Sequence, residues 1–284
     1  MAPVKVPVNL PELVKMAFSR ARASGDVFFF ETQVTLVNVN SVPVQRQQEK
    51  ETLLRPFDNP APAMLITPLA SAHNLVLNKF AIVPEHFILA TQAFKEQTHL
   101  LERADLEKEL YVFFNSGAAS GSSQPHRHIQ MLPVAKMRRD DGDQDRAWDV
   151  LAGVSEEEVR GRVPFQTFAE EIKRGDEKNL YEVYLRLYRK ACEAVLGSAE
   201  AQGVIVDDVM VIAPRVAEGE AVVGLTEDGE RRPVGKLALN GTVLAGTALV
   251  KTQEEWDALR DDPGQLHQLL GRIGLPNIQA PSLL

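Results

Sequence analysis

Cysteine and histidine are scarce in this chain of 284 residues, which holds one cysteine, Cys192, and six histidines. A single cysteine cannot form an internal disulfide, and one cysteine with scattered histidines does not make a zinc framework. Cys192 lies at helical spacing from Tyr188, Ala191 and Val195, which favours a buried packing role. We therefore predict no metal site and no disulfide scaffold.

Long apolar runs and excess basic charge are also lacking. No window approaches about 18 apolar residues, and residues 1–18 lack the apolar core of a signal peptide. The chain has 31 basic and 39 acidic residues, a net charge of -8. Such an acidic chain is a poor candidate for binding nucleic acid or a membrane surface. We expect a cytoplasmic protein without membrane contact, in which a local cluster of donors can still bind a small anion.

The composition, with 44% hydrophobic and 25% charged residues, is that of a globular protein. Strands are expected at 27–39, 65–69, 73–82, 111–114, 126–134, 204–214 and 234–250. Helices are expected at 10–24, 91–101, 177–196 and 253–273, the last broken near Pro263, and a loop at 41–63. Strands fall in clusters without regular βαβ alternation, so the predicted class is α+β. The charged stretch 138–146 marks the first candidate boundary.

The most informative stretch is 115–130, NSGAASGSSQPHRHIQ. Side chains alternate along a strand, so His126, His128 and Gln130 should project from one face. The preceding glycines let the backbone approach a ligand, and N–H groups and serine hydroxyls there can donate to phosphate oxygens. A donor loop that leads into a His-x-His-x-Gln strand suits attack on a phosphorus atom.

Histidine suits this chemistry because neutral imidazole, with an ordinary pKa of about 6.5, is a nucleophile near physiological pH. Its other ring nitrogen must keep its hydrogen, held by an acceptor. A His-x-His pair is also common as a metal site or as surface decoration. A metal site is disfavoured because the remaining histidines, His73, His86, His99 and His267, show no ligand spacing.

The segment SGSSQPHRHIQ resembles the histidine-triad superfamily, in its His-x-His-x-Gln branch of nucleotidyl transferases. It is most similar to the diadenosine tetraphosphate phosphorylase (ATP adenylyltransferase) family, whose signature is Gly-Ala-Ser-Gln-Pro-His-x-His-x-Gln. The sister galactose-1-phosphate uridylyltransferases carry Asn-Pro-His-Pro-His-x-Gln, and this chain lacks the first Asn and the middle Pro. The segments RPFDNP, HNLVLNKFAIVPEHFILATQAF, YVFFNSG and LALNGTVLAGTALVK extend the resemblance over most of residues 25–275.

This resemblance implies a histidine-triad-like antiparallel sheet with flanking helices. It implies an N-terminal catalytic part, 1–195, and a C-terminal ATP adenylyltransferase lobe, 196–284. The implied reaction is phosphorolysis of diadenosine tetraphosphate to ATP and ADP through a covalent adenylyl-histidine. By position, His128 would be the nucleophile, His126 would orient the site, and Gln130 would contact the α-phosphoryl group.

The resemblance also implies a set of substrate-binding positions. These are Asn78, Lys79, Asn115, Gly121, Ser122, Ser123, Gln124, Asn240, Gly241, Thr242, Thr247 and Lys251. The two lysines would offset polyphosphate charge. Ser122 replaces the usual Ala of the family, and Gly241 and Val243 replace a Ser and a Gly.

The expected partners are diadenosine polyphosphate, ATP, ADP and phosphate, bound by a monomer or small homo-oligomer. No cofactor is required, although a divalent cation such as Mg²⁺ could help by neutralising phosphate charge. The alternatives are adenylyl sulfate phosphorolysis, uridylyl transfer to a sugar phosphate, or a non-catalytic nucleotide-binding protein.

Overall fold

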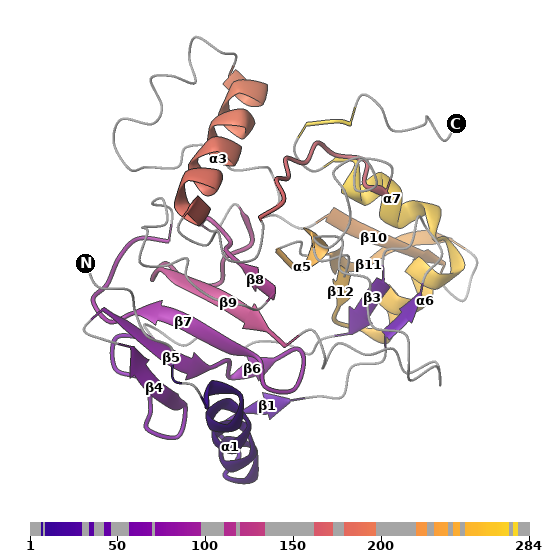
Figure 1. Cartoon of the computed structure of the whole chain (residues 1–284). Coiled ribbons are helices and arrows are strands. Elements are labelled where there is room, and N and C mark those ends of the chain that lie inside the picture. Colours follow the sequence, from indigo (N-terminus) through magenta and orange to yellow (C-terminus); the bar gives the residue numbers. More distant parts are fainter. Residues whose placement is uncertain are drawn as a thin grey trace.

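The computed structural model describes residues 7, 9–29, 34–36, 43–46, 57–69, 72–97, 111–117, 120–133, 162–172, 179–196, 220–225, 230–237, 241–244, 248–272 and 275–277. Figure 1 shows an N-terminal sheet with helices α1 and α3, and beside it a C-terminal lobe that contains α6 and α7. The predicted α+β class is confirmed. Within the described part of the chain, no helix is long and apolar enough to cross a membrane.

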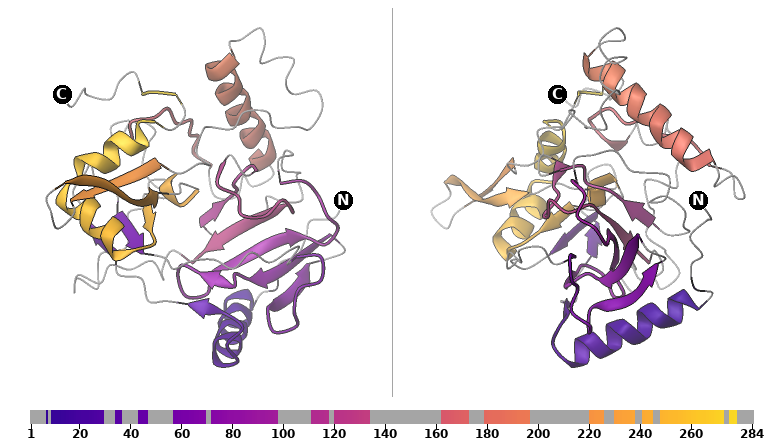
Figure 2. Two further views of the ribbon diagram at one scale, coloured as in Figure 1. Left: turned by 180° about the vertical axis from the view of Figure 1, so that it is seen from behind. Right: turned by 90° about the vertical axis from the view of Figure 1, so that its left-hand side faces the viewer.

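The N-terminal sheet has five strands in the order β4-β5-β7-β9-β8, and all its pairs are antiparallel. The strands are β4 (Leu65–Leu69), β5 (His73–Leu77), β7 (Phe87–Thr91), β9 (His128–Leu132) and β8 (Tyr111–Phe113). Beside them, β1 (Phe28–Phe29) pairs in parallel with β6 (Phe80–Ala81). Figures 1 and 2 show α1 (Leu10–Ala23) near the β4–β5 edge and α3 (Leu180–Leu196) near the β8 edge.

The two faces of this sheet have different neighbours. Leu75, Leu89, Ile129 and Met131 form one buried cluster with Leu10 and Val14, which lie on the apolar stripe of α1. Because side chains alternate, the opposite face carries Val76, Ile88 and Ala90, which cluster with Phe57. Cross-strand partners share a face, and Ala90 pairs with His128 while Ile88 pairs with Gln130. His128 and Gln130 therefore lie on the face opposite α1.

The C-terminal lobe combines a hairpin with a sheet that includes N-terminal residues. Strands β10 (Glu220–Leu225) and β11 (Arg231–Leu237) are antiparallel. Strand β12 (Ala248–Val250) pairs in parallel with β3 (Pro43–Arg46), which pairs with β2 (Val34–Leu36). The core comprises buried residues of β10–β12, the segment around Phe165, α6 (Gln253–Asp261) and α7 (Gly264–Leu270). The short α5 (Gly241–Leu244) precedes β12.

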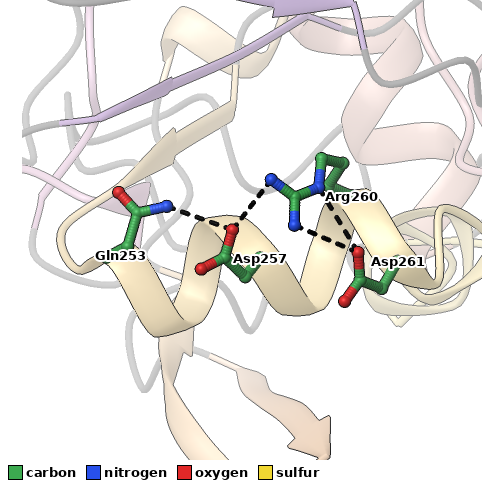
Figure 3. Close-up of polar contacts among 4 residues, drawn as sticks. All are labelled: Gln253, Asp257, Arg260 and Asp261. Carbon is green, nitrogen blue, oxygen red and sulfur yellow. Dashed lines mark hydrogen bonds and ion pairs between the residues drawn. The ribbon is translucent and has the colours of Figure 1, made fainter.

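Helix α6 shows how the local sequence fixes this lobe. It begins with a capping box in which the Thr252 hydroxyl accepts from the Glu255 N–H and the Glu255 carboxylate accepts from the Thr252 N–H. Ala258 and Leu259 face the core. Gln253, Asp257, Arg260 and Asp261 form a row of hydrogen bonds and ion pairs on the helix (Figure 3). The helix thus presents Ala258, Leu259 and the hydrogen-bonded Glu255 to the lobe and its other charged side chains to water.

Several predicted elements are confirmed: the helices at 10–24, 177–196 and 253–273 with the break near Pro263, and the strands at 65–69 and 111–114. Cys192 is buried, as predicted. The expected strand 73–82 is split into β5 and β6, and β9 covers only 128–132 of the strand expected at 126–134. Two short strands, β1 and β2, lie within 27–39.

Three expectations are wrong, and in the first two a distant partner decides the local structure. The helix predicted at 91–101 is absent from residues 91–97: Thr91 ends β7, and Glu96 forms a β-bridge with His126. The loop predicted at 41–63 contains β3, which is stabilised by pairing with β12. The strand predicted at 234–250 contains α5 between β11 and β12.

Some predictions lie outside the described residues. These include the strand at 204–214, residues 98–101, and the charged stretch 138–146. The division of the chain at residues 195 and 196 stays a prediction. The pairing of β3 with β12 nevertheless shows that an N-terminal strand belongs to the sheet of the C-terminal lobe.

Candidate active site

The His128 side chain has a defined tautomer. His128 begins β9 and is only 3% exposed. Its Nδ1 lies 2.8 Å from the backbone carbonyl oxygen of His126. A carbonyl oxygen can only accept, so Nδ1 must carry the hydrogen, and in the neutral ring the lone pair is therefore on Nε2. This is the state that a histidine nucleophile requires.

The His126 ring is enclosed, with 1% exposure. It contacts Phe57 and Phe94, with ring centroids 5.8 Å and 5.3 Å away, and its Nε2 lies 2.9 Å from the Thr91 hydroxyl. Its Nδ1 is 3.1 Å from an Asp58 carboxylate oxygen, but the two are not aligned for a hydrogen bond. Packing on several sides fixes the position of His126. Its carbonyl, which accepts from His128 Nδ1, is therefore fixed too.

Phe57 confirms that the two histidines share a face. Its ring centroid lies 5.1 Å from that of His128 and 5.8 Å from that of His126. Gln130 belongs to the same face through its pairing with Ile88. The predicted alternation of this segment is therefore confirmed.

The amide of Gln130 is oriented by Asn78. The Nδ2 of Asn78 donates to Gln130 Oε1 at 3.4 Å and lies 3.1 Å from Nε2 of the buried His86. Asn78 Oδ1 accepts from the Phe80 N–H at 3.0 Å, which fixes the direction of the Asn78 amide. Since Gln130 Oε1 accepts from Asn78, its NH2 end is the one that can donate to a phosphoryl oxygen.

The glycine-rich loop curls around one carbonyl. Gly117 and Gly121 have φ of 77° and 83°, a conformation that favours glycine. The N–H groups of Ser120 and Ser122 each donate to the Gly117 carbonyl at 3.1 Å, and the Ser122 hydroxyl donates to the Gln124 carbonyl at 2.8 Å. Ser122 thus uses both its N–H and its hydroxyl within the loop, whereas Ser123 is exposed and Gln124 is half-buried. Phosphate contact by Gly121, Ser122, Ser123 and Gln124 stays a prediction.

Asn115 links the loop to the C-terminal lobe. It is 4% exposed, and its Oδ1 accepts from the Gly241 N–H at 2.7 Å. Within the described part of the chain, Asn115 Nδ2 and the Ser116 hydroxyl are buried polar groups without a hydrogen-bond partner. Buried donors rarely stay unsatisfied, so these two are suited to a ligand's oxygens.

Gly241 at the start of α5 packs directly on β8. A Cβ at this position would lie 2.5 Å from Cδ2 of Phe113, so the replacement of the family's Ser by Gly fits the bulky neighbour. Thr242 is buried, while Lys251 is exposed. The remaining predicted contacts of this lobe, Asn240 and Thr247, lie outside the described residues.

Lys79 lies beside an aromatic pair. Its Nζ is 5.4 Å from the ring centroid of Phe28 and 5.7 Å from that of Phe80, and these two rings are stacked. Such cation–π contacts hold the ammonium group without removing its charge. A polyphosphate contact of Lys79 stays a prediction.

Sequence reasoning missed the polar residues that support these side chains: Asp58, Thr91 and Gln97, together with the buried His86. The side chain of Gln97 bonds to the backbones of His128 and Asn115. Asp58, His86 and Thr91 lie within the segments RPFDNP and HNLVLNKFAIVPEHFILATQAF, which carry the resemblance but give these residues no role, and Gln97 lies outside both. No local pattern signals any of these contacts.

Comparison with known proteins identifies the family to which the chain is similar. A family model described as the Ap4A phosphorylase N-terminal domain matches residues 20–142, and one described as the ATP adenylyltransferase C-terminal domain matches residues 161–276. Diadenosine tetraphosphate phosphorylase 2 of Saccharomyces cerevisiae is 27% identical over 251 residues, which cover 78% of this chain and 76% of the relative. Protein APA1 of the same yeast is 26% identical over 164 residues, 46% of this chain and about half (51%) of its own length.

Solved structures show the same fold. Yeast Ap4A phosphorylase Apa2 in complex with AMP has a TM-score of 0.65 and 22% sequence identity, covering 96% of this chain and 100% of that one. Apa2 in complex with Ap4A has a TM-score of 0.63 and 20% identity, covering 96% and 99%. The fold predicted from the His-x-His-x-Gln segment is confirmed.

Proposed function

Because the chain belongs to the Ap4A phosphorylase (ATP adenylyltransferase) family, we propose that it catalyses the phosphorolysis of diadenosine tetraphosphate to ATP and ADP. The observation that carries this proposal is the hydrogen bond from His128 Nδ1 to the His126 carbonyl, 2.8 Å long. It leaves the lone pair on His128 Nε2, and mere nucleotide binding does not require such a nucleophile.

The first step is attack of the Nε2 lone pair on an α-phosphorus atom of the substrate. A P–N bond forms and the bond to the bridging oxygen breaks, so ATP leaves with that electron pair. The ring then carries a positive charge, which the Nδ1–H bond to the His126 carbonyl stabilises. Negative charge on the phosphoryl oxygens meets the Gln130 NH2 group, whose direction Asn78 sets.

The second step returns the ring to its starting state. An oxygen of inorganic phosphate attacks the same phosphorus, and the P–N bond breaks with its electron pair returning to Nε2. ADP leaves, and the proton that hydrogenphosphate carried is released. Adenylyl sulfate phosphorolysis and uridylyl transfer would use the same two displacements, so the donor and acceptor must be identified by experiment.

The polyphosphate charge must be offset in a chain whose net charge is -8. We assign this role to Lys79 and Lys251 together with loop N–H groups other than those of Ser120 and Ser122, which bond to Gly117. The reaction moves an adenylyl group between oxygen and nitrogen without redox change, so it needs no resident cofactor. Among the described residues, no group of three or more His, Cys, Asp or Glu is placed to hold a metal ion. The substrate phosphates themselves are ligands for a divalent cation such as Mg²⁺.

The test uses the purified protein with diadenosine tetraphosphate, with and without phosphate, followed by intact mass and nucleotide analysis. We expect an AMP-sized adduct without phosphate, and ATP and ADP when phosphate is added. His128→Ala should abolish both the adduct and turnover, whereas His267→Ala, a change in α7, should keep both. Absence of an adduct and of turnover in the unaltered protein would exclude the proposal. Adenylyl sulfate and a uridylyl donor, offered in parallel, identify any other preferred substrate.

A further inference from the structure

We propose that Gln97 is a positioning residue for His128: its side-chain amide, inserted between β9 and the chain that follows β8, holds the His128 backbone in the position that adenylyl transfer requires. The effect on rate rests on the proposed function of His128. The contact itself does not, and the two are tested separately below.

The contacts are three hydrogen bonds from one buried amide. Gln97 is 1% exposed. Its Oε1 accepts from the His128 N–H at 2.7 Å, and its Nε2 donates to the His128 carbonyl at 3.1 Å and to the Asn115 carbonyl at 2.8 Å. One side chain thus satisfies both backbone polar groups of His128 and joins them to Asn115.

The strand register shows why a side chain is needed there. The last pair of the β8–β9 ladder is Phe113 with Gln130, and the same register would bring Phe114 opposite Ile129 and then Asn115 opposite His128. At that step the Gln97 amide lies between the two backbones and offers a peptide-like donor and acceptor in place of the neighbouring strand. The ladder is therefore continued through a side chain.

The backbone around Gln97 is itself fixed. The Arg127 N–H donates to the Lys95 carbonyl at 2.7 Å, and the Gln97 N–H donates to the Pro125 carbonyl at 2.8 Å. Glu96 and His126 form a β-bridge between the same two segments. The segment that carries Gln97 is thus paired with the residues just before the proposed nucleophile.

Two independent anchors then define where His128 Nε2 lies. The His126 carbonyl sets the rotation of the ring, and Gln97 sets the position of the backbone from which the ring projects. Displacing a reacting atom by about 1 Å can cost about a hundredfold in rate. Loss of the Gln97 amide should therefore slow chemistry more than it weakens substrate binding.

The decisive variant is Gln97→Met, which keeps the length of the side chain and removes the donor and the acceptor. We expect the single-turnover rate of adduct formation at saturating diadenosine tetraphosphate to fall about a hundredfold, with KM changed less than about threefold. A fall of less than tenfold would overturn the proposal. If this variant does not fold, Gln97→Glu serves, because it keeps the acceptor for the His128 N–H and loses the donor to both carbonyls; the same threshold applies.

The chain offers a matched control. Gln265 in α7 holds a backbone in the same way, with its Nε2 donating to the Val223 carbonyl at 2.9 Å and its Oε1 accepting from the Val223 N–H. Gln265→Met removes an equivalent buried amide. This amide lies in the C-terminal lobe and is far from His128 in the sequence. We expect its rate to stay within twofold of the unaltered protein. A comparable loss of rate in this control would show a general effect of destabilisation and would also overturn the proposal.

A measurement without substrate separates this inference from the proposed function. Hydrogen exchange of the His128 backbone amide in the unaltered protein should be slow, because its N–H is bonded to Gln97. Exchange as fast as that of exposed loop amides would overturn the contact even if turnover is observed. Slow exchange without any adduct would instead refute the proposed chemistry and leave the contact standing.

Discussion

The packing of α5 on β8 predicts how much a substitution of Gly241 destabilises the protein. Gly241 begins α5, and its N–H donates to Asn115 Oδ1 at 2.7 Å. A Cβ at this position would lie 2.5 Å from Cδ2, 2.9 Å from Cγ and 2.9 Å from Cβ of Phe113. Rotation of the Phe113 ring could relieve the contact with Cδ2. The contact with Phe113 Cβ cannot be relieved unless the backbone moves. Gly241→Ala should therefore push α5 away from β8.

Three effects determine how much Gly241→Ala changes the free energy of unfolding. Overpacking of a buried contact costs about 1–3 kcal/mol. Weakening the hydrogen bond between Gly241 and Asn115 costs about 0.5–1.5 kcal/mol. The substitution also restricts the unfolded chain, which offsets about 0.4–1 kcal/mol. The net expectation is destabilisation by about 2 kcal/mol, and displacement of Asn115 should lower turnover as well.

The assay is urea unfolding of matched variants. Gly264→Ala is the control, since a Cβ at Gly264 meets only Asp262 Oδ1 at 3.6 Å, an ordinary contact. That variant should be as stable as the unaltered protein or slightly more stable. In a Phe113→Leu background the contact with the ring edge is lost, but the contacts with Cβ and Cγ at 2.9 Å remain, so most of the cost of Gly241→Ala should persist. Equal stability of the two glycine variants, or loss of the whole cost in that background, would refute the reasoning.

Two further substitutions test polar contacts. Asn78→Ala removes the donor that orients Gln130, so turnover should fall about tenfold or more. Asn74→Ala, whose Oδ1 accepts only from Gln92 among the contacts described, should leave turnover near its original value; equal effects of the two changes would contradict the assigned role of Asn78. Glu255→Gln should destabilise the protein by about 2 kcal/mol in urea unfolding, since the buried carboxylate accepts from the N–H groups of Lys236, Lys251 and Thr252. The exposed Glu254→Gln is its control, and similar stability of both variants would show that the Glu255 bonds contribute little.

The reactive strand was the part of the site that sequence could predict best. Alternation along a strand is local, so His126, His128 and Gln130 could be assigned to one face before any coordinates. The structure confirms this through Phe57, which contacts both histidine rings. The acceptor required for the second ring nitrogen could also be anticipated, although the residue that supplies it could not.

The supporting contacts could not be predicted, even for Asn78, which the resemblance marks as a site position, because they depend on partners far away in the chain. Gln97 is 31 residues from His128, and Asn78 is 52 residues from Gln130. The local sequence around Gln97 predicts a helix, since it carries no sign of the bridge to His126. Long-range pairing overrides the local propensity of this segment, as it does in β3.

Buried side-chain amides take the place of a backbone partner in both lobes of this protein. Gln97 and Gln265 each satisfy the N–H and the carbonyl of a backbone residue, as a neighbouring strand would. Asn115 receives the Gly241 N–H across 126 residues of sequence. Through Gln97, which bonds to both Asn115 and His128, this bond connects the histidine strand to α5 of the C-terminal lobe. A substrate bound by donors from both lobes would therefore meet groups whose relative positions are already fixed, and catalysis would not have to supply the free energy of ordering them.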